Sequence, residues 1–574
     1  MATSVSPDVA AEITTQLGKT ELGGDNDATS NQDSTAKARK HGWVEAEKYD
    51  YNHYLDDKNV PDDTKAWASK AARYEWSDEF GDVAPALPEL EKQLFEDEHI
   101  MRQGPEIAGL EYKALVEGPV KVQRVQKFED AGLHPVILDN VVRLCRYDAP
   151  TPIQQYVLPA VFQGYDVVGC AHTGSGKTAA YMVPILSKLM GKAKKLAAPR
   201  DRARAEPLVL VVCPTRELAL QIFDEGRKLC YRSRLRPCVV YGGAPVRAQR
   251  EDLERGCDIL IATPGRLADF MDKPHVLALN RLKYTVIDEA DEMLQDDWEE
   301  ALRRVMASGE TASDDHRFLM FSATFPKNAR ALAKQYMDKT HMRIRVGRTG
   351  STHKNIHQAF VWADDSKKRE ALNNLMTSIP PARTLIFVNS RKAADLVDDY
   401  LFNLGFPSTS IHSERTQLER EDALRAFKTG STPILIATGV SARGIDIKNI
   451  MHVVNYDLPS MMHGGIEEYI HRIGRTARIG NIGMSTSFYN ERNEDIAEDL
   501  AKILVETNQE VPDFLADKAP NPGDTIVWDD DTDDEAEEGG VAAEGTNGFG
   551  ATTDSGMGWN GSADANGAAT DNTW

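Results

Sequence analysis

The sequence has few cysteines and no long apolar run, and both absences exclude classes of protein. The six cysteines among 574 residues all lie between positions 145 and 257, and no two of them are spaced as a CxxC pair. This distribution argues against a zinc knuckle and a disulfide framework, and it favours a reducing compartment, cytosol or nucleus. No run of about 18 apolar residues occurs, and the first residues lack a basic start followed by an apolar core. We therefore expect neither a membrane span nor a secretory signal.

Basic residues are also scarce overall, but the deficit is not spread evenly along the chain. The 67 Lys and Arg stand against 89 Asp and Glu, which gives a formal net charge of −22. Residues 1–105 carry 22 acids against 11 bases, and residues 513–574 carry 15 acids against one base. Residues 106–512 are therefore close to neutral, at about +3. Because phosphate binding requires local positive charge, this central part can bind a polyanion although the whole chain is acidic.

The two acidic ends are expected to form arms outside the folded part. Few aliphatic residues and an acidic block at 529–538 leave residues 513–574 unable to bury enough surface to offset chain entropy. We predict disorder there and through most of residues 1–105. The arms hold six of the eight tryptophans: Trp43, Trp67, Trp76, Trp528, Trp559 and Trp574. These tryptophans are either docking points for partner proteins or parts of local clusters, and both interpretations stay open.

Short β-branched runs alternate with helix-compatible stretches through the central part. The first series of runs is 166–170, 208–213, 238–241, 258–262, 284–288 and 318–322, and the second is 384–388, 408–411, 434–438, 452–456 and 485–488. This alternation predicts two α/β domains with parallel sheets, at 106–346 and 357–512, joined by a Gly-rich linker at 347–356. Because ligands gather at the carboxyl ends of parallel strands, the residues just after each run are the candidates for function.

A phosphate-binding loop follows the first run, in the string AHTGSGKT at 171–178. Glycines in such a loop let backbone N–H groups point into one concavity at a helix N-terminus. The residues expected around the phosphates are Thr173, Gly174, Ser175 and Gly176. Lys177 supplies a positive charge, and Thr178 supplies a hydroxyl for Mg²⁺. The loop alone predicts only that the protein binds a nucleoside triphosphate.

The run at 284–288 leads directly into the tetrapeptide DEAD at 288–291. Asp288 at the strand end can hold Mg²⁺ through water, and Glu289 can orient or deprotonate the attacking water. An isolated acidic tetrapeptide is more often a solvated helix start. A buried strand that feeds into it, downstream of a phosphate loop, favours a hydrolytic site instead.

In this order the motifs resemble those of the DEAD-box RNA helicases, and the resemblance extends over residues 128–480. It implies two RecA-like domains, ATP as the nucleotide with Mg²⁺, and RNA as the partner. In the string RYDAPTPIQ, Gln154 would bond the adenine edge, Tyr147 would stack on its face, and Phe128 resembles the family's upstream aromatic. The strings PTPIQ and GRTGST are most similar to those of Vasa-like members.

The resemblance also assigns residues that link the nucleotide site to strand separation. Ser322, Ala323 and Thr324, in the string FSATFP, match the family's coupling motif. Asp291 and His471 are expected to take part in the same coupling.

The second domain would complete the nucleotide site with cationic side chains. In the string HRIGRTAR, Arg475 and Arg478 would contact the γ-phosphate and the developing charge, as arginine fingers do in other NTPases. Gly444 and Asp446 would close over the nucleotide from the same side. On spacing alone, the arginines fit a charged helix surface paired with acids. Position 477 is usually glycine in the family, and the alanine here would strain a left-handed backbone.

An RNA path is implied along both domains. The resemblance places RNA contacts on Pro214, Thr215, Arg216, Gly242, Gly243, Thr263, Pro264, Gly265 and Arg266 in the first domain, and on Gln417, Arg420, Thr438, Gly439 and Arg443 in the second. Glycines and helix starts at strand ends present N–H groups to phosphates without reading bases. We therefore expect binding that is independent of sequence and sensitive to salt. Taken singly, the strings PTREL at 214–218 and TPGR at 263–266 fit ordinary capped helix starts.

The sequence therefore predicts a monomeric ATP-dependent RNA helicase that separates short duplexes. We expect it in the cytoplasm, with the nucleus and RNP granules left open, and with protein partners on the acidic or Trp-bearing arms. The segment 460–470 is longer than is usual in the family and enlarges a surface loop. Two other functions stay open: an ATP-gated RNA clamp or RNP-remodelling scaffold, and a translocating DNA motor.

Overall fold

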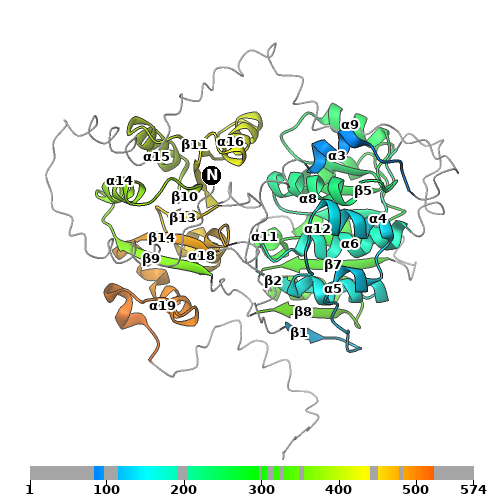
Figure 1. Cartoon of the computed structure of the whole chain (residues 1–574), viewed down its shortest axis with the longest axis horizontal. Helices are drawn as coiled ribbons and strands as arrows, with labels where there is room; N and C mark the ends of the chain where they lie inside the picture. The colour runs from blue at the N-terminus through cyan, green and yellow to red at the C-terminus, as the bar shows by residue number, and fades with distance from the viewer. Residues whose placement is uncertain are drawn as a thin grey trace, which may run out of the picture. The chain divides into compact units, whose positions relative to one another are not determined.

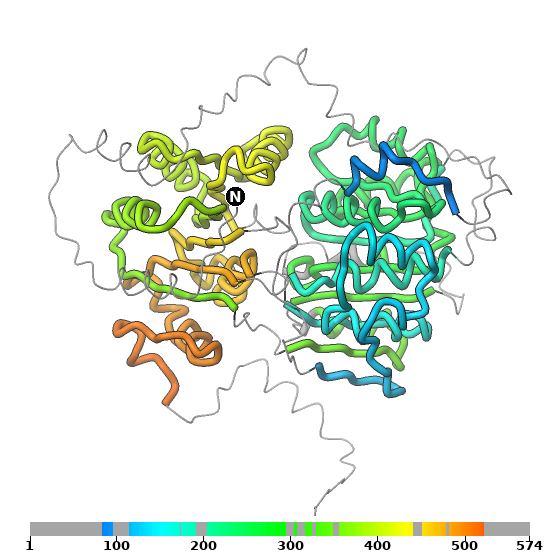
Figure 2. The backbone as a smooth tube through the Cα atoms, viewed as in Figure 1, coloured from blue at the N-terminus to red at the C-terminus, as the bar shows by residue number. Residues whose placement is uncertain are grey.

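The computed structural model describes residues 83–95, 114–172, 174–190, 204–295, 299–306, 316–323, 327–347, 355–439, 450–477 and 482–521. Within these ranges the chain forms two α/β domains, each built on its own sheet (Figures 1 and 2). The prediction of two tandem parallel-sheet domains is confirmed. Most of the predicted arms, 1–105 and 513–574, lies outside the described residues. No helix in the described part of the chain is long and apolar enough to cross a membrane.

The first domain is built on an eight-stranded sheet with the order β1-β8-β2-β7-β6-β3-β5-β4. Its strands are β1 (Ala114–Glu117), β2 (Val167–Ala171), β3 (Val209–Val212), β4 (Pro237–Val240), β5 (Ile259–Ala262), β6 (Tyr284–Ile287), β7 (Arg317–Ser322) and β8 (Met342–Val346). Strands β2, β3, β5 and β6 are buried along their whole length, which explains their uninterrupted apolar sequences. All neighbours pair in parallel except β1, which is antiparallel to β8.

Helices cover both faces of this sheet (Figure 1). The helices are α3 (Pro88–Phe95), α4 (Pro135–Asp139), α5 (Pro152–Gln163), α6 (Lys177–Met190), α8 (Arg216–Leu229), α9 (Val246–Glu254), α10 (Pro264–Met271), α11 (Ala290–Gln295), α12 (Glu299–Met306) and α13 (Lys327–Tyr336), with a 3₁₀ turn η6 (Phe128–Ala131) and a π-helical turn η7 (Asn140–Leu144). Apolar side chains of α5, α6 and α8 form the core on one face. Those of α10, α12 and α13 form the core on the other face.

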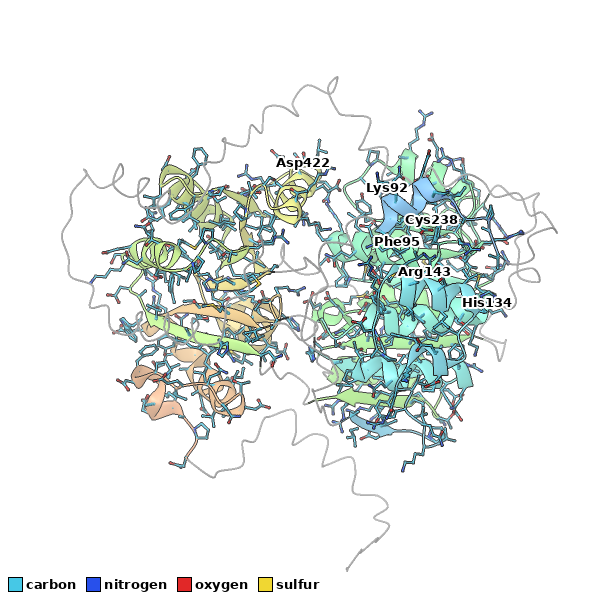
Figure 3. All side chains as sticks on the ribbon, in the orientation of Figure 1. Lys92, Phe95, His134, Arg143, Cys238 and Asp422 are labelled. Carbon is cyan, nitrogen blue, oxygen red and sulfur yellow. The ribbon has the colours of Figure 1, made fainter. Side chains whose placement is uncertain are left out.

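A short stretch that the sequence places within the N-terminal arm packs against the first domain. Phe95 of α3 is buried, and its ring meets that of Tyr231 edge-on at 5.9 Å. The Tyr231 hydroxyl accepts a hydrogen bond from Leu87 N at 3.0 Å. Arg143 of η7 lies 3.7 Å from Glu91 of α3. Figure 3 labels Phe95 and Arg143 on this side of the domain. The packing of the first domain therefore includes residues 83–95, upstream of the boundary expected at 106.

The second domain is built on a six-stranded parallel sheet with the order β11-β12-β10-β13-β14-β9. Its strands are β9 (Ile356–Trp362), β10 (Thr384–Val388), β11 (Ser408–Ile411), β12 (Ile434–Thr438), β13 (His452–Asn455) and β14 (Gly483–Tyr489). Its helices are α14 (Lys368–Ser378), α15 (Arg391–Asn403), α16 (Gln417–Thr429), α18 (Gly465–Ile473) and α19 (Ala497–Glu506), with the 3₁₀ turns η8 (Met461–His463), η9 (Glu491–Ile496) and η10 (Asp513–Lys518). Apolar side chains of α14 and α15 pack on one face of the sheet, and Phe427 of α16 packs on the other.

The turn η10 lies within the stretch predicted to be a disordered tail, yet it packs on the second domain. Phe514 stacks on Tyr489 with ring centroids 5.3 Å apart, and it meets Trp362 at 5.6 Å. Leu515 is fully buried, and Lys518 lies 2.8 Å from Glu494. Packing of the second domain therefore continues past residue 512, where the sequence places its end.

We expect the substitution Leu515→Ala to destabilise the second domain. Truncation of a fully buried leucine typically costs about 2–5 kcal/mol, because apolar burial is lost and a cavity remains. Thermal unfolding should show a lower Tm for the variant. Replacement of the neighbouring exposed Asp517 by alanine is the matched control and should leave Tm unchanged. Equal Tm values for Leu515→Ala and the native chain would show that η10 adds nothing to the fold.

The strand order sorts the predicted site residues into two groups along the first sheet. The strands that precede the phosphate loop, the SAT motif and the DEAD motif are the neighbours β2, β7 and β6. The strands that precede PTREL, TPGR and the double glycine, Gly242 and Gly243, are the neighbours β3, β5 and β4. Because parallel strands end at the same edge, one half of this edge carries the nucleotide motifs and the other half the RNA motifs.

Candidate active site and nucleic-acid interface

The phosphate loop joins β2 to α6, and its backbone has the shape that the glycines allow. Gly174 and Gly176 have φ values of 78° and 83°, in the left-handed region that favours glycine. A Cβ at Gly176 would lie only 2.6 Å from Gln154 Nε2. Lys177 begins α6, and its Nζ donates a hydrogen bond to Ala171 O at 2.9 Å. The buried Ser175 Oγ has no hydrogen-bond partner among the described residues, so this loop has polar capacity left for a ligand.

Gln154 connects the proposed adenine-reading motif to the phosphate loop. Its Nε2 donates to Gly176 O at 3.0 Å, and its Oε1 accepts from Thr151 N at 3.0 Å. Tyr147 lies next to this motif, 6.3 Å from the buried ring of Phe128, and its hydroxyl contacts Glu225 of α8. The structure thus joins Gln154 to the phosphate loop and places Tyr147 next to Phe128, whose ring is buried in the core.

The carboxylates of the DEAD motif lie at the end of β6 in an unusual backbone conformation. Asp288 is buried, and its Oδ2 accepts a hydrogen bond from the Tyr181 hydroxyl at 3.0 Å. Glu289 has a φ of 53°, and its N donates to Asp288 Oδ1 at 3.0 Å. A left-handed glutamate costs about 1–2 kcal/mol, and such strain recurs at functional sites. The buried Glu289 Oε2 has no hydrogen-bond partner in the described part of the chain.

Burial and neighbouring charges set the protonation of these carboxylates. Burial, with the negative charges of Glu292 and Asp288, raises the pKa of Glu289 to about 8, although the positive charges of Arg475 and Lys177 oppose the rise. Burial also raises the pKa of Asp288, whereas Lys177 and the Tyr181 hydrogen bond lower it. The positive charge of Arg475, in the second domain, thus acts on Glu289, the carboxylate that the sequence assigns to water activation. A carboxyl with a pKa near neutral is suited to exchange a proton with water.

Asp291 joins three of the predicted coupling residues. Its N donates to Ser322 Oγ at 3.3 Å, and its Oδ2 accepts from Ala323 N at 3.3 Å. The same Oδ2 lies 3.9 Å from Nε2 of His471 on α18. The end of β7, the start of α11 and a helix of the second domain therefore meet at one carboxylate.

The RNA motifs of the first domain combine helix starts with two arginines. Thr215 caps α8, with its Oγ1 accepting from Leu218 N at 3.3 Å, and Pro214 precedes it. Arg216 lies over the double glycine, where a Cβ at Gly243 would collide with its guanidinium. Gly243 has a φ of 86°, so the backbone conformation favours glycine here.

The TPGR motif also starts a helix, α10, but without a side-chain capping hydrogen bond. Thr263 is the N-cap residue of this helix, and Pro264 follows at its first position. Arg266, two residues on from Pro264, donates from Nη2 to Ala244 O at 3.2 Å, which ties this motif to the loop after the double glycine. Gly265 lies between them in the same helical turn. For PTREL the cap interpretation and the phosphate interpretation are thus compatible, because the capped start leaves Arg216 at the sheet edge. TPGR starts a helix without a side-chain cap and leaves Arg266 at the same edge.

Two predicted RNA contacts of the second domain pair with the first domain. Arg216 Nη1 donates to Gln417 Oε1 at 2.9 Å. Arg420 Nη2 lies 2.7 Å from Glu217 Oε1, and both side chains are buried or nearly so. In the second sheet, Thr438 ends β12 and Gly439 follows it; Gly439 packs so closely against Glu468 that a Cβ would collide with its carboxylate.

Several predicted site residues lie outside the described residues: Thr173, Thr324, Arg443, Gly444, Asp446 and Arg478. Thr178 is described, as the second residue of α6. Arg475 is buried just beyond the end of α18. Ala477, where the family usually has glycine, has a φ of 53° and therefore carries the strain that the sequence suggested.

The sequence did not predict several residues that contact the site residues and hold them in place. Tyr181 holds Asp288, and Glu292 faces His471. Arg472 is buried and donates to Glu468 Oε1 at 2.9 Å, Asp457 O at 2.8 Å and Asn389 Oδ1 at 3.0 Å. The helical i,i+4 spacing of Glu468 and Arg472 was the available signal for their pair. No comparable signal marks Tyr181, because its partner is 107 positions away.

The groups present fit ATP with Mg²⁺. Lys177 and Ser175 belong to the glycine-rich loop after β2, and Asp288 and Glu289 follow β6 in the same half of the sheet edge. No group of three or more His, Cys, Asp or Glu side chains among the described residues could hold a metal ion by itself. This donor set matches Mg²⁺, which keeps several waters and binds through one or two protein oxygens and the substrate phosphates.

Comparison with known proteins gives the class of the chain. A family model for the DEAD/DEAH box helicases matches residues 151–332, and a model for the helicase conserved C-terminal domain matches residues 367–480, together just over half of the chain. The structure of S. cerevisiae Dbp5 bound to RNA and ADP BeF3 is similar at 25% identity and a TM-score of 0.58, over 67% of this chain and 95% of that chain. Mss116p bound to ssRNA and AMP-PNP is similar at 25% identity and a TM-score of 0.57, over 70% and 86% of the two chains.

The chain therefore belongs to the DEAD-box helicases. It is an ATP-dependent RNA helicase with two RecA-like domains, an enzyme that hydrolyses ATP with Mg²⁺ and binds RNA. The similarity to Vasa-like members stays a prediction.

Proposed function

We propose that ATP is hydrolysed between Lys177, Asp288 and Glu289 of the first domain and Arg475 of the second. The observation that carries this assignment is the contact between the domains at the DEAD motif, where His471, four residues before Arg475, lies 3.4 Å from Glu292 and 3.9 Å from Asp291. The positive charge of Arg475 lowers the pKa of Glu289. In this proposal Lys177 and the loop at 174–178 bind the phosphates, and Gln154 and Tyr147 orient the adenine. Glu289 orients the attacking water and takes its proton. Arg475, with Arg478, stabilises the charge that develops on the transferred phosphoryl group.

Thr178 and Asp288 would hold Mg²⁺, Asp288 through water. When bound, Mg²⁺ supplies charge neutralisation at the phosphate oxygens. The protein's own part is to keep Asp288 ionised despite its burial, which the Lys177 charge and the Tyr181 hydroxyl support. We infer a clamp cycle: ATP and RNA bind, the two domains close, one short duplex loses pairing, and hydrolysis reopens the clamp. A scaffold that clamps RNA without unwinding would keep ATPase activity but fail to separate a short duplex without overhangs, so an unwinding assay tests the proposal.

The RNA is proposed to lie along the capped helix starts and arginines after β3, β4 and β5. Because Arg216 and Arg266 approach from strand ends and lie near backbone N–H groups, they would contact phosphates and not bases. Arg420 and Gln417 would extend the same path on the second domain. A DNA motor would respond equally to both nucleic acids; stronger stimulation of the ATPase by RNA than by single-stranded DNA is expected here.

We expect Arg266→Ala to weaken RNA binding to the same extent for all RNA sequences. Loss of one phosphate contact should also lower the slope of log K against log salt by about 1. Equilibrium binding of unrelated RNA oligomers at several salt concentrations measures both quantities. The matched control is Arg247→Ala, at a side chain 91% exposed on the same domain. A loss confined to one RNA sequence would argue that Arg266 reads bases.

We further propose a cytoplasmic monomer whose acidic arms carry protein contacts. The six cysteines are buried free thiols, which supports a reducing compartment. Cell fractionation tests the compartment, with nucleus and RNP granules as the alternatives. Partner capture with and without the Trp-bearing arms tests the proposed contacts, and sedimentation tests the oligomeric state.

The acidic block at 529–538 is proposed to compete with RNA for the basic path. Deletion of residues 524–574 should then tighten RNA binding at low salt, and the gain should shrink as salt screens the block. Neutralising the block with Asn and Gln, in a chain of unchanged length, should reproduce the effect. Unchanged RNA affinity and an unchanged salt slope after deletion would reject the competition.

A further inference from the structure

Glu292 follows the DEAD tetrapeptide and has no role in the assignments made so far. It lies on α11 and is buried, and its Oε1 lies 3.4 Å from Nδ1 of His471. On the opposite side of the same ring, Nε2 of His471 lies 3.9 Å from Asp291 Oδ2. The His471 side chain is 10% exposed, so solvent does not replace either carboxylate. The imidazole of the second domain thus lies between two adjacent carboxylates of the first domain.

This environment favours the doubly protonated imidazole. A neutral histidine has one N–H and one acceptor nitrogen, whereas the imidazolium can donate from both nitrogens. Burial by itself lowers the pKa of His471, but the hydrogen bond and charge of Glu292, with the charges of Asp291 and Glu468, raise it to about 9. These three carboxylates are the charged groups that face the ring from α11 and from its own helix α18. His471 is therefore a cation at neutral pH.

Of the two carboxylates on α11, Glu292 is the stronger partner of His471. The Asp291 Oδ2 also accepts a hydrogen bond from Ala323 N, and it lies farther from the ring. Glu292 is nearer, and its effect on His471 includes a hydrogen bond in addition to its charge. Asp291 alone cannot hold the ring in the charged form as firmly, because a buried imidazolium needs compensation at both nitrogens.

We propose that Glu292 is a positioning residue for hydrolysis: it holds His471 as a cation against α11 and thereby aligns the end of α18, where Arg475 follows. His471 and Arg475 are four positions apart, and Arg475 N donates to Arg472 O at 3.1 Å, so their placement is coupled through one helical turn. The same contact keeps Asp291 between Ala323 and the second domain. This inference rests on the proposed role of Arg475.

The sign of the pH dependence follows from the raised pKa. In the separated or unfolded state histidine titrates at its ordinary value of about 6.5. A group whose pKa is raised in the assembled state stabilises that state fully below its ordinary pKa, and the stabilisation disappears as pH rises through the raised value. The contact between His471 and Glu292 should therefore be fully effective at pH 6 and lost as pH passes about 9.

The test is the pH profile of RNA-stimulated ATP hydrolysis by full-length Glu292→Gln. Glutamine keeps the size and one acceptor but removes the charge, so the alkaline limb of kcat should move to lower pH by about one unit or more. At pH 6 its kcat should be at least that of the native chain, because loss of the Glu292 charge also lowers the pKa of Glu289. Glu292→Asp retains the charge and should keep the limb closer to its native position. The control Glu254→Gln removes an exposed charge on α9 and should leave the profile unchanged.

Titration of His471 by histidine-selective NMR measures the same effect directly, with a lower pKa expected in Glu292→Gln. A loss of kcat that is equal at every pH would indicate a merely structural role and overturn the proposal. An unshifted NMR titration would overturn it as well. Full turnover by Arg475→Ala would reject the proposed nucleotide site, whatever the profile of Glu292→Gln, so the two failures are distinguishable.

Discussion

Glu289→Gln is expected to reduce multiple-turnover ATP hydrolysis by about 10²–10⁴-fold, the usual contribution of a positioned general base. Glutamine has nearly the same shape, so the left-handed backbone at φ 53° and the hydrogen bond from residue 289 N to Asp288 Oδ1 should persist. What disappears is the acceptor for the proton of water, at an oxygen that has no other hydrogen-bond partner among the described residues. ATPase measurements at saturating RNA provide the test.

The same variant should still bind ATP and RNA together, because the phosphate loop and the arginine path are untouched. We expect RNA complexes formed with ATP to persist longer than those of the native chain, since hydrolysis no longer opens the clamp. Glu251→Gln, at a half-exposed position on α9, is the control for a lost charge. Full ATPase activity of Glu289→Gln would remove Glu289 from the mechanism and reassign the base.

Parallel strands buried on both faces could be predicted from the sequence, and half-buried or edge strands could not. β10, β11 and β12 begin and end where the predicted β-branched runs do. β8 has the sequence MRIRV with alternating burial, and β9 is only partly buried, so neither forms a continuous apolar run. β1 has four residues and pairs antiparallel with β8, a partner more than 220 positions away. Such pairings depend on tertiary contacts that local periodicity does not encode.

The candidate site divides in the same way. Residues in motifs at strand ends, such as Lys177 and Asp288, could be predicted because parallel strands bring their carboxyl ends to one edge. The residues that hold them could not, because Tyr181 and Glu292 occur in ordinary helical sequence and acquire partners only through folding. Packing of each domain also extends past the limits expected from the sequence, for a related reason. Phe95 and Leu515 are single apolar anchors in polar stretches, and composition averages conceal them.

At position 477 the chain departs from the family pattern, and the backbone there has a conformation that favours glycine. Glycine is the common residue there in the family, and Ala477 takes a left-handed conformation with φ 53°. Gly483 packs against Thr476 and Ala477 so tightly that a Cβ on it would collide with both residues. A left-handed alanine costs about 1–2 kcal/mol, so the surrounding structure holds it in a conformation that the residue itself does not favour.

Arg475→Ala is expected to reduce RNA-stimulated kcat by about 10³-fold, the lower range for an arginine that stabilises phosphoryl transfer. Arg475 is buried, and its charge acts on Glu289 from the other domain, so no solvent cation can replace it. The loss should appear in kcat, with little change in the KM for ATP, because the first domain supplies the phosphate loop and the adenine contacts. Steady-state kinetics at saturating RNA separate the two parameters.

Two further variants decide what the Arg475 result means. Arg475→Lys keeps the charge but not the planar group with two donor nitrogens, so it should recover only part of the lost rate. Arg492→Ala removes a side chain that is 82% exposed on the same domain and should leave kcat unchanged. If Arg475→Ala instead raised the KM for ATP at constant kcat, Arg475 would bind substrate and transition state equally. ATP hydrolysis would then not depend on a cation from the second domain, and RNA-driven closure would need another link to the chemistry.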